Sequence, residues 1–355
     1  MPPSIDSLDL PRCLGTALGA NAPRYLVRWG VIDALSFKPR FPWWGPDLQT
    51  LASRMLAPVS LGPHATERLV FPMADGSGDT LLALLDRPAE PRAGTPLAIL
   101  VHGLTGLETS RYMLSMSRHL LDRGLRVLRL NLRGAGPSRA LCADHYYAGR
   151  SQDFRHLLSL LPAGLATDGL VAVGYSLGGA MLLKYLGEEG AATPLRAAAT
   201  VCAPIDLSLT CRNMMRPRNW LYHRYILGQM KAEAVGGAAR LTSDERAAIA
   251  GSRTVWDYDD RFIAPRYGFG GAEDYYERCR PSRFMPAIRV PTLVLAALDD
   301  PWIPGSLYEG FDWAGNRALR PVLSRHGGHV GFHGPDGPHP WSDRVIARFF
   351  ETGGE

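Results

Sequence analysis

The sequence predicts an α/β fold, in which a mainly parallel β-sheet is covered by helices on both faces. Short, continuous apolar runs alternate with helix-like stretches along most of the chain. Hydrophobic residues make up 46% of the chain and charged residues 21%, an ordinary composition for a globular protein. The 355 residues are enough to build a large core. A helix between two strands returns the chain to the end of the sheet where the first strand began, so the two strands run parallel and the crossover is right-handed.

The sheet is expected to begin with an antiparallel hairpin and to continue with buried parallel strands. Residues 67–73 and 79–88 flank the segment 75–78, whose sequence Asp-Gly-Ser-Gly is typical of a turn. The following strands are apolar runs of the kind that is buried on both faces of a sheet. They are expected at 96–102, 125–131, 169–175, 196–202, 290–298 and 318–324. The prediction is an eight-stranded, mostly parallel sheet.

Helices and one long insertion complete the predicted organisation. Residues 1–65 are rich in Pro and Trp and are interpreted as an N-terminal arm, partly helical and partly irregular. Residues 205–282 are too many for an ordinary connection and are predicted to form a mostly helical cap. Such an insertion near the carboxyl ends of parallel strands lies over the ligand crevice. The remaining residues, 66–204 and 283–355, would form one core. Its helices are expected at 110–123, 151–161, 180–186 and 341–351.

Composition and charge exclude several classes of protein. No stretch approaches the roughly 18 uninterrupted apolar residues of a membrane span, and the N-terminus lacks the basic region of a secretory signal. The five cysteines form no CxxC pair, which argues against a disulfide scaffold and favours the cytoplasm. The net charge of +5 comes from scattered arginines, so we expect no nucleic-acid partner and at most a weak peripheral membrane contact. No feature specifies an oligomeric state.

The strongest functional signal is a G-x-S-x-G motif at residues 174–178, with a further glycine at 179. By itself such a motif indicates only a glycine-rich turn between a strand and a helix. Here it directly follows a predicted buried strand and opens a predicted helix, which is the context of a nucleophilic serine. The glycines remove Cβ clashes, so that a strained turn can expose the Ser176 hydroxyl. We therefore predict Ser176 as the nucleophile.

A serine nucleophile needs a base, and the base needs an acid to orient it. In this order of chain segments the acid follows a late core strand, where Asp299 and Asp300 compete. An alternative interpretation of Asp299 is a turn-capping or solvated residue without a catalytic role. Asp206, after the preceding core strand, is a less favoured alternative, because its position suits an Asx-turn that leads into the cap.

The base is expected in the loop between the last strand and the last helix. This loop contains His326, His329 and His333 among several glycines. We choose His329, because the glycines on both sides of it allow the loop to bend over the nucleophile; the other two are interpreted as loop or rim residues. The loop has no matching set of cysteines or carboxylates, so no metal site is predicted.

Two backbone amides are predicted to stabilise a developing oxyanion. One belongs to Leu177, the residue after the nucleophile. The other is expected in the loop that follows the strand ending near His102, where the Leu104 amide is the candidate. His102 lies on an apolar strand, so it is interpreted as a brace for this loop.

Together these residues resemble the α/β-hydrolase superfamily, and more narrowly its YheT-like branch, which includes alpha/beta-hydrolase-domain proteins 1 and 3. The resemblance covers the chain from about residue 40 to its end. It implies carboxylic-ester hydrolysis without a cofactor, in some members on lipids. It also implies a triad of Ser176, Asp300 and His329, since Asp300 begins the usual acid turn. The motifs that carry it are Pro46-Asp47-Leu48-Gln49-Thr50, His102-Gly103-Leu104-Thr105-Gly106, Asn131-Leu132-Arg133-Gly134, the G-x-S-x-G motif, Asp274-Tyr275-Tyr276, Asp299-Asp300-Pro301 and Gly327-Gly328-His329-Val330-Gly331-Phe332.

The predicted function is therefore a serine hydrolase that cleaves small-molecule carboxylic esters with short- to medium-chain or lipid-like acyl groups. An acyltransferase or a thioesterase would use the same triad, and a non-catalytic binder would use only the fold. Aromatic residues of the cap are candidates for an acyl pocket, although packing within the cap explains most of them. They are Trp220, Tyr222, Tyr225, Trp256, Tyr258, Tyr275 and Tyr276.

Overall fold

An eight-stranded sheet forms the centre of the molecule. The computed structural model describes residues 37–354; residues 1–36, most of the predicted N-terminal arm, lie outside the described part. The strands are β1 (Ala65–Pro72), β2 (Thr80–Arg87), β3 (Leu97–Val101), β4 (Val127–Leu130), β5 (Leu170–Tyr175), β6 (Leu195–Val201), β7 (Thr292–Ala297) and β8 (Leu319–Ser324). Their order is β1-β2-β4-β3-β5-β6-β7-β8. Strands β1 and β2 pair antiparallel, as do β2 and β4, and all other pairs are parallel.

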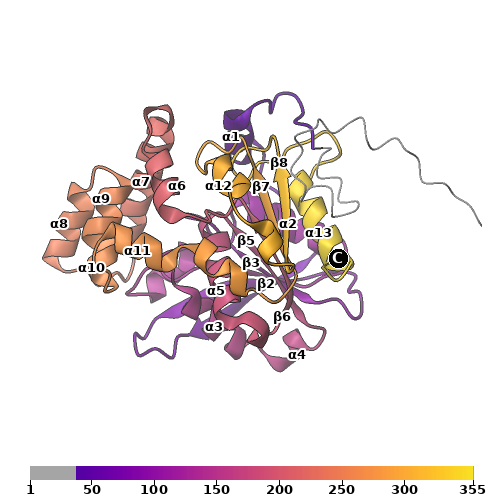
Figure 1. Ribbon diagram of the computed structural model, residues 1–355. Coiled ribbons are helices and arrows are strands. Elements are labelled where there is room, and N and C mark those ends of the chain that lie inside the picture. Colours follow the sequence, from indigo (N-terminus) through magenta and orange to yellow (C-terminus); the bar gives the residue numbers. More distant parts are fainter. Residues whose placement is uncertain (1–36, 355) are drawn as a thin grey trace, which may run out of the picture. The chain divides into compact units, whose positions relative to one another are not determined.

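Helices cover both faces of this sheet. Figure 1 shows α2 and α13 on one face and α3 and α5 on the other. The helices are α1 (Pro46–Met55), α2 (Arg111–Leu121), α3 (Ser151–Leu160), α4 (Ala163–Ala166), α5 (Leu177–Glu189), α6 (Leu207–Met214), α7 (Trp220–Val235), α8 (Ser243–Gly251), α9 (Val255–Tyr258), α10 (Ala264–Arg266), α11 (Ala272–Cys279), α12 (Gly305–Glu309) and α13 (Trp341–Glu351). None of these helices is both long and apolar enough to cross a bilayer.

The predicted fold class is confirmed, and the burial of the strands explains why the prediction worked. Every residue of β3, β4, β5 and β7 is buried, as expected for strands that are covered on both faces. One helix was predicted too short: α5 begins at Leu177 rather than at 180. Its first turn contains two glycines, which are poor helix formers, so tertiary packing overrides local propensity there.

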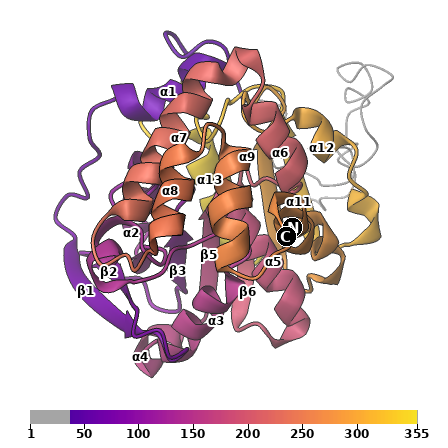
Figure 2. The ribbon, with the colours of Figure 1, turned by 90° about the vertical axis from the view of Figure 1, so that its left-hand side faces the viewer.

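A helical insertion lies between β6 and β7. Helices α6 to α11 form it, and Figure 2 shows them in front of the sheet, with α1 beside the upper end of α7. A buried cluster holds these helices together and joins them to Ala148 and Ala180 of the rest of the molecule; it is built from apolar residues of α6, α7, α8 and α11 and from tyrosines of α9 and α11. Two capping boxes start α8 and α9, at Thr242 and Thr254.

The Asn131–Gly134 motif has a structural role in this fold. The buried Arg133 guanidinium contacts the carboxylates of Asp75, Asp79 and Asp153 at 2.7–2.8 Å. These charges raise the pKa of Arg133, although burial alone would lower it. The cluster ties the turn between β1 and β2 to helix α3. The loss of Arg133 would leave the buried carboxylates of Asp79 and Asp153 without their main counter-charge.

Candidate active site

The carboxyl ends of the parallel strands bring the predicted site residues to one edge of the sheet. Ser176 follows β5, and the loop with Leu104 follows β3. Asp300 follows β7 at a distance of three residues, and His329 follows β8. Parallel strands end at the same edge, and for this reason residues more than 150 positions apart in the sequence come together there.

Ser176 occupies a sharp turn between β5 and α5. Its backbone angles are φ 49° and ψ −121°, which is a strained conformation for a residue with a side chain. The flanking glycines allow this turn. A Cβ at Gly178 would lie 2.3 Å from the His102 carbonyl oxygen, and one at Gly174 would lie 2.7 Å from the Gly178 carbonyl oxygen. The turn places the Ser176 hydroxyl at the N-terminus of α5.

Ser176, His329 and Asp300 form a continuous chain of hydrogen bonds. His329 Nε2 lies 2.9 Å from Ser176 Oγ, and His329 Nδ1 lies 2.7 Å from Asp300 Oδ2. His329 and Asp300 are both buried. The Asp300 carboxylate accepts the Nδ1 proton, so Nε2 is free to accept the proton of the serine hydroxyl. This geometry suits a serine activated by an oriented imidazole.

The structure also separates the two competing carboxylates. Asp300 Oδ1 accepts the backbone N–H groups of Trp302 and Ile303 at 2.8 and 3.1 Å, which leaves Oδ2 directed at His329. Asp299 instead accepts the Gly328 N–H at 2.9 Å and lies 3.3 Å from the exposed His326 ring. Burial raises the pKa of Asp299. Asp299 therefore holds the backbone of the histidine loop at Gly328 and does not contact the His329 ring, which is the role of a turn-capping residue.

The loop after β3 leaves one backbone amide free beside Ser176. The Gly103 N–H donates to Tyr112, the Thr105 N–H to Tyr146, and the Gly106 N–H back to the Gly103 carbonyl. Within residues 37–354, neither the Leu104 amide nor the Leu177 amide has an acceptor. A Cβ at Gly103 would lie 3.0 Å from Ser176 Cβ, so this loop passes close to the serine.

His102 braces this loop, as predicted. Its Nδ1 donates to the Gly103 carbonyl at 2.8 Å, and its Nε2 accepts the Leu132 N–H at 3.0 Å. Burial lowers the pKa of His102 to about 4, so the ring stays neutral. Both ring nitrogens are therefore used in holding backbone, which leaves His102 no proton-transfer role.

The remaining candidates lie outside the hydrogen-bond chain. Asp206 caps helix α6 by accepting the Leu209 N–H at 2.9 Å, so it is the predicted turn residue. His326 is exposed. His333 was interpreted as a loop or rim residue, but its side chain is buried under Trp43, and burial lowers its pKa to about 4. Because the N-terminal segment folds over this loop, His333 has no access to the rim.

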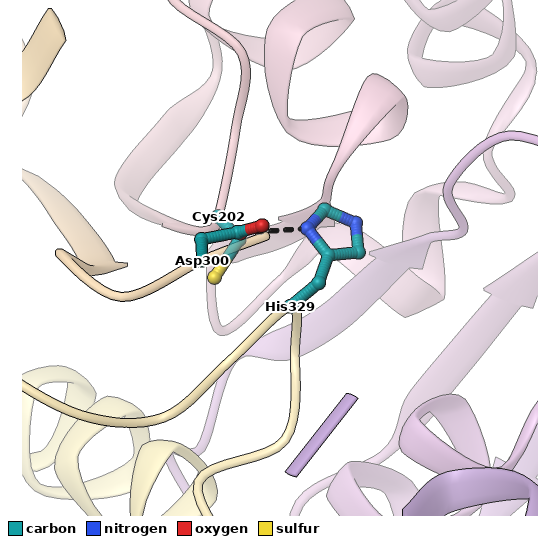
Figure 3. A group of neighbouring side chains, drawn as sticks. All are labelled: Cys202, Asp300 and His329. Atoms are coloured by element: carbon teal, nitrogen blue, oxygen red, sulfur yellow. Dashed lines mark hydrogen bonds and ion pairs between the residues drawn. The ribbon is translucent and has the colours of Figure 1, made fainter. Parts of the chain in front are cut away.

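Cys202 adds a thiol to the same cluster. It follows β6, and Figure 3 shows its sulfur beside Asp300 and His329. The ligand atoms of the three residues lie within 4.8 Å of one another, a spacing that could hold a metal ion. However, Asp300 already binds His329 Nδ1, and burial, with the Asp300 charge, raises the pKa of the Cys202 thiol well above its ordinary value. A protonated thiol is a poor metal ligand, so this donor set does not suit a metal.

Helix α1 holds the histidine loop, a role that the sequence did not reveal. The Thr50 hydroxyl accepts the His329 N–H at 2.8 Å and donates to the Pro46 carbonyl at 2.7 Å. The buried Gln49 amide clamps His333 on both sides, accepting its N–H at 2.7 Å and donating to its carbonyl at 3.0 Å. The Pro46–Thr50 motif was the available signal, but its partners lie about 280 residues away.

Comparison with known proteins identifies the family. Residues 96–335 match the family described as the alpha/beta hydrolase fold. The chain belongs to this family. Within the family it is similar to the putative esterase YheT of Escherichia coli, with 30% identity over 319 residues that cover 86% of this chain and 90% of YheT.

Other relatives of this alpha/beta hydrolase are longer proteins. Mouse phospholipase ABHD3 is 29% identical over 72% of this chain, and the match spans 64% of ABHD3. The medium-chain fatty acid ethyl ester synthase/esterase 2 of Saccharomyces cerevisiae is also 29% identical, over 72% of this chain and 62% of the yeast protein. The branch with YheT and ABHD3 that the sequence motifs predicted is confirmed.

Solved structures support the same fold at low sequence identity. The Pyrococcus furiosus esterase Pf2001 aligns with a TM-score of 0.53 and 14% identity, over 88% of this chain and 98% of its own. Est1E from Butyrivibrio proteoclasticus aligns with a TM-score of 0.51 and 15% identity, over 80% of this chain and 98% of its own. The relatives of this alpha/beta hydrolase are described as esterases and phospholipases, and its likeness to the solved structures shows the fold.

Proposed function

We propose that the protein hydrolyses carboxylic esters through an acyl-enzyme, with Ser176, His329 and Asp300 as its catalytic triad. The observation that carries this proposal is the hydrogen-bond chain from Ser176 Oγ through His329 to Asp300. Ser176 Oγ attacks the ester carbonyl while His329 Nε2 takes the hydroxyl proton. Asp300 keeps the ring in the required tautomer and stabilises the imidazolium.

The second half of the proposed reaction returns the enzyme to its starting state. The free Leu104 and Leu177 amides bind the oxyanion of the tetrahedral intermediate. His329 then gives its proton to the leaving alcohol, which departs as the acyl–Ser176 ester forms. Water attacks this ester with His329 again as the base, releasing the acid and restoring the serine. No cofactor or metal enters this sequence.

We propose that the chain is divided into a core, a cap and an arm. Residues 66–204 and 283–355 form the core that carries the triad, and residues 205–282 act as a cap over it. The arm proposed for residues 1–65 contains helix α1 in its described part, and this helix holds the histidine loop. The substrates are small-molecule esters with short- to medium-chain or lipid-like acyl groups, supported by the names of the YheT, ABHD3 and yeast relatives.

A serine-reactive fluorophosphonate probe tests the proposal directly. We expect the purified protein to be labelled, and peptide mass spectrometry to locate the label on Ser176. The reason is that only an activated serine reacts quickly with such a probe. Hydrolysis of p-nitrophenyl esters from acetate to octanoate should accompany the labelling. A protein that neither reacts with the probe nor cleaves any of these esters, but binds one tightly, would be a non-catalytic binder.

Acyl transfer to an alcohol is the second candidate, favoured by one comparison. The name of the yeast relative includes both ester synthesis and ester hydrolysis. If this chain shares that ability, added ethanol should compete with water for the acyl-enzyme and yield an ethyl ester. Product analysis by gas chromatography, with and without ethanol, distinguishes the two. Release of acid alone at high ethanol would assign the protein to the hydrolases, and a matched thioester series would test thioesterase activity.

Thr50→Val should lower kcat without changing the fold. The substitution keeps the side-chain shape but removes the acceptor of the His329 N–H, leaving a buried donor unpaired. Such a loss costs about 1–3 kcal/mol, which corresponds to roughly a tenfold effect or more if it falls on the position of the imidazole. Steady-state kinetics and the rate of probe labelling measure the effect. Thr50→Ser, which keeps the hydroxyl, is the matched control and should retain most of the activity; equal activity of both variants would refute the role of Thr50.

We further propose a weak peripheral contact with anionic membranes. Segments 37–58 and 209–225 contain seven Arg or Lys and one Asp, and Asp47 joins them by binding Arg218. The exposed apolar side chains of these segments are Phe41, Trp44, Leu48, Met55, Leu209, Trp220, Leu221 and Tyr225. Sedimentation with anionic liposomes should recover the protein at low salt and lose it at high salt. No recovery at low salt, or equal recovery with neutral liposomes, would contradict this contact.

We also propose that the protein works in the cytoplasm. The cysteines among the described residues, Cys142, Cys202, Cys211 and Cys279, are free and buried, which suits a reducing compartment. Fractionation of cells followed by immunoblotting would test this location, and recovery of the protein in a secreted fraction would contradict it.

A further inference from the structure

The loop after β3 makes a tight turn of an unusual form. The Gly106 N–H donates to the Gly103 carbonyl at 3.0 Å, which closes a β-turn with Leu104 and Thr105 as its central residues. Of these two, Thr105 alone has a positive φ, 56°. This pattern is that of a type II turn, in which the third residue is usually glycine. A β-branched threonine is strained there, so the surrounding structure must hold it in place.

The peptide between Leu104 and Thr105 distinguishes this turn from its common alternative. In a type I turn, which needs no positive φ, this peptide is turned over, and ψ of Leu104 differs by about 150°. In the structure the Thr105 N–H donates to the Tyr146 hydroxyl at 2.7 Å. A turned-over peptide would present the Leu104 carbonyl oxygen to that hydroxyl instead. The contact at Tyr146 therefore decides between the two forms.

Tyr112 fixes the loop on the other side of Leu104. Its hydroxyl accepts the Gly103 N–H at 3.0 Å. Its ring packs on Tyr175, the residue before the proposed nucleophile, with 4.7 Å between the ring centroids. The amides before and after Leu104 are thus each bound by a tyrosine hydroxyl, Tyr112 from α2 and Tyr146 from the segment before α3. This arrangement leaves the Leu104 N–H as the free donor of the turn.

A carboxyl group of the cap sets the direction of the Tyr146 hydroxyl. Glu233 lies near the end of α7, and its Oε2 accepts the Tyr146 O–H at 2.8 Å. A hydroxyl group has only one proton to donate. Because this proton goes to Glu233, the Tyr146 oxygen is left to accept, and it can hold an N–H but not a carbonyl. The contact favours the turn that presents the Thr105 N–H.

The relay from Glu233 to the loop borders the proposed oxyanion donors. Glu233 and Tyr146 line the same hollow beneath the cap as Leu104 and Leu177. Burial raises the pKa of Glu233 to about 7. A neutral carboxyl group still accepts a hydrogen bond through its carbonyl oxygen, so the Tyr146 O–H keeps its acceptor in both protonation states.

We propose that Glu233 and Tyr146 are positioning residues of the oxyanion hole, through which the cap holds the loop after β3 in its type II form. An amide stabilises an oxyanion only when it is held about 2.7–3.1 Å from it, and a loop that alternates between two turns is correctly placed in only a fraction of molecules. Both residues act through the Leu104 amide. This inference rests on the proposed esterase function and gives the cap a part in its chemical step.

Tyr146→Phe tests the relay by removing the hydroxyl and keeping the ring. We expect kcat for p-nitrophenyl butyrate to fall roughly tenfold to hundredfold, less than the about 10²- to 10³-fold loss when an oxyanion donor itself is removed. KM should stay within about twofold, since the lost contact acts in the transition state. Tyr185→Phe is the matched control, because its buried hydroxyl binds Thr193 at 3.1 Å toward the far end of α5. It should keep the wild-type kcat.

Two variants of Glu233 separate the hydrogen bond from the charge. Glu233→Met and Glu233→Gln both remove the carboxylate, whose charge interacts with Arg139. Glutamine keeps an oxygen that can accept the Tyr146 O–H, whereas methionine does not. We expect Glu233→Met to lower kcat roughly threefold to tenfold and Glu233→Gln to retain most of it. Combined with Tyr146→Phe, neither should lower kcat further, because Glu233 acts only through that hydroxyl.

An analogue of the tetrahedral intermediate reports on the oxyanion hole separately from substrate binding. Ser176 Oγ would add reversibly to the carbonyl carbon of 1,1,1-trifluorooctan-2-one while His329 takes the hydroxyl proton, and the carbonyl oxygen becomes an oxyanion. The inhibition constant of this ketone should rise in each variant by about the factor by which kcat/KM falls. The corresponding alcohol, 1,1,1-trifluorooctan-2-ol, has no carbonyl to form the adduct and should bind all variants with little change.

The outcomes separate this inference from the esterase proposal. If the wild-type protein neither cleaves the esters nor reacts with the serine probe, the proposed function fails and the relay with it. If it is active, but Tyr146→Phe keeps its kcat, Glu233→Gln loses as much as Glu233→Met, or the ketone binds all variants alike, only the relay is overturned. Circular dichroism checks folding, and the Glu233 pair decides if Tyr146→Phe does not fold. Loss of kcat and ketone affinity in Glu233→Met, but not in Glu233→Gln or Tyr185→Phe, supports the relay.

Discussion

Ser176→Ala should lower kcat/KM for p-nitrophenyl esters on the order of 10⁴-fold or more. The substitution removes the only atom that can form the acyl-enzyme, while the oxyanion amides and the pocket remain and give slight residual catalysis. The esters from acetate to octanoate should all lose activity together, since the lost atom acts on the carbonyl that they share. Initial rates at several substrate concentrations measure the loss.

A control must show that this loss is chemical. Alanine keeps the Cβ of the strained turn, so circular dichroism and the melting temperature should stay close to those of the wild type. Ser208→Ala is a matched serine variant, since its hydroxyl contacts only Glu273 and Arg212 on the surface of the cap. It should keep full activity. If Ser176→Ala hydrolysed the esters as fast as the wild type, or still reacted with the fluorophosphonate probe, Ser176 would not be the nucleophile.

Asp300→Asn should reduce kcat by roughly 10³- to 10⁴-fold. An asparagine at this position can still accept the Trp302 and Ile303 amides through its oxygen, which then directs its NH₂ group at His329 Nδ1. The imidazole would accept that bond and carry its proton on Nε2, so it could no longer take the proton of Ser176. The effect should fall on kcat far more than on KM, because the Asp300 carboxylate contacts the imidazole and two backbone amides but would not contact the substrate.

Asp299→Asn is the matched control for that variant. Its side chain lies next to Asp300 in sequence, has the same size, and binds the Gly328 N–H rather than the His329 ring. An asparagine oxygen can still accept this N–H, so we expect kcat within about threefold of the wild type. A larger loss in Asp299→Asn than in Asp300→Asn would assign the acid to Asp299 and contradict the geometry described above.

The regular parts of the fold were open to prediction because their signals are local. The buried strands read as continuous apolar runs, and each observed strand lies within two residues of its expected limits. The hairpin of β1 and β2 was also predictable, because residues typical of a turn lie between its two strands. Element ends were harder, as the early start of α5 at Leu177 illustrates, because a strained serine turn and close packing decide where that helix begins.

Site residues that lie within a recognisable local sequence motif could be predicted. Ser176 and His329 are of this kind, each surrounded by glycines that allow a special turn. Gln49, Thr50 and Cys202 were missed as parts of the site. Their side chains gain a role only through contacts with a loop 126 to 284 residues away, and no local pattern reports such a contact.

By itself the sequence determined the order of the strands and main helices and the family to which the chain belongs, whereas the nucleophile and the Leu104 amide stay predictions. Only the tertiary structure decided that Asp300 rather than Asp299 faces His329, because two adjacent carboxylates differ only in where the chain directs them. It also decided that α1 holds the histidine loop. Local preferences set the elements, whereas the site depends on distances between segments that meet only when the whole sheet is assembled.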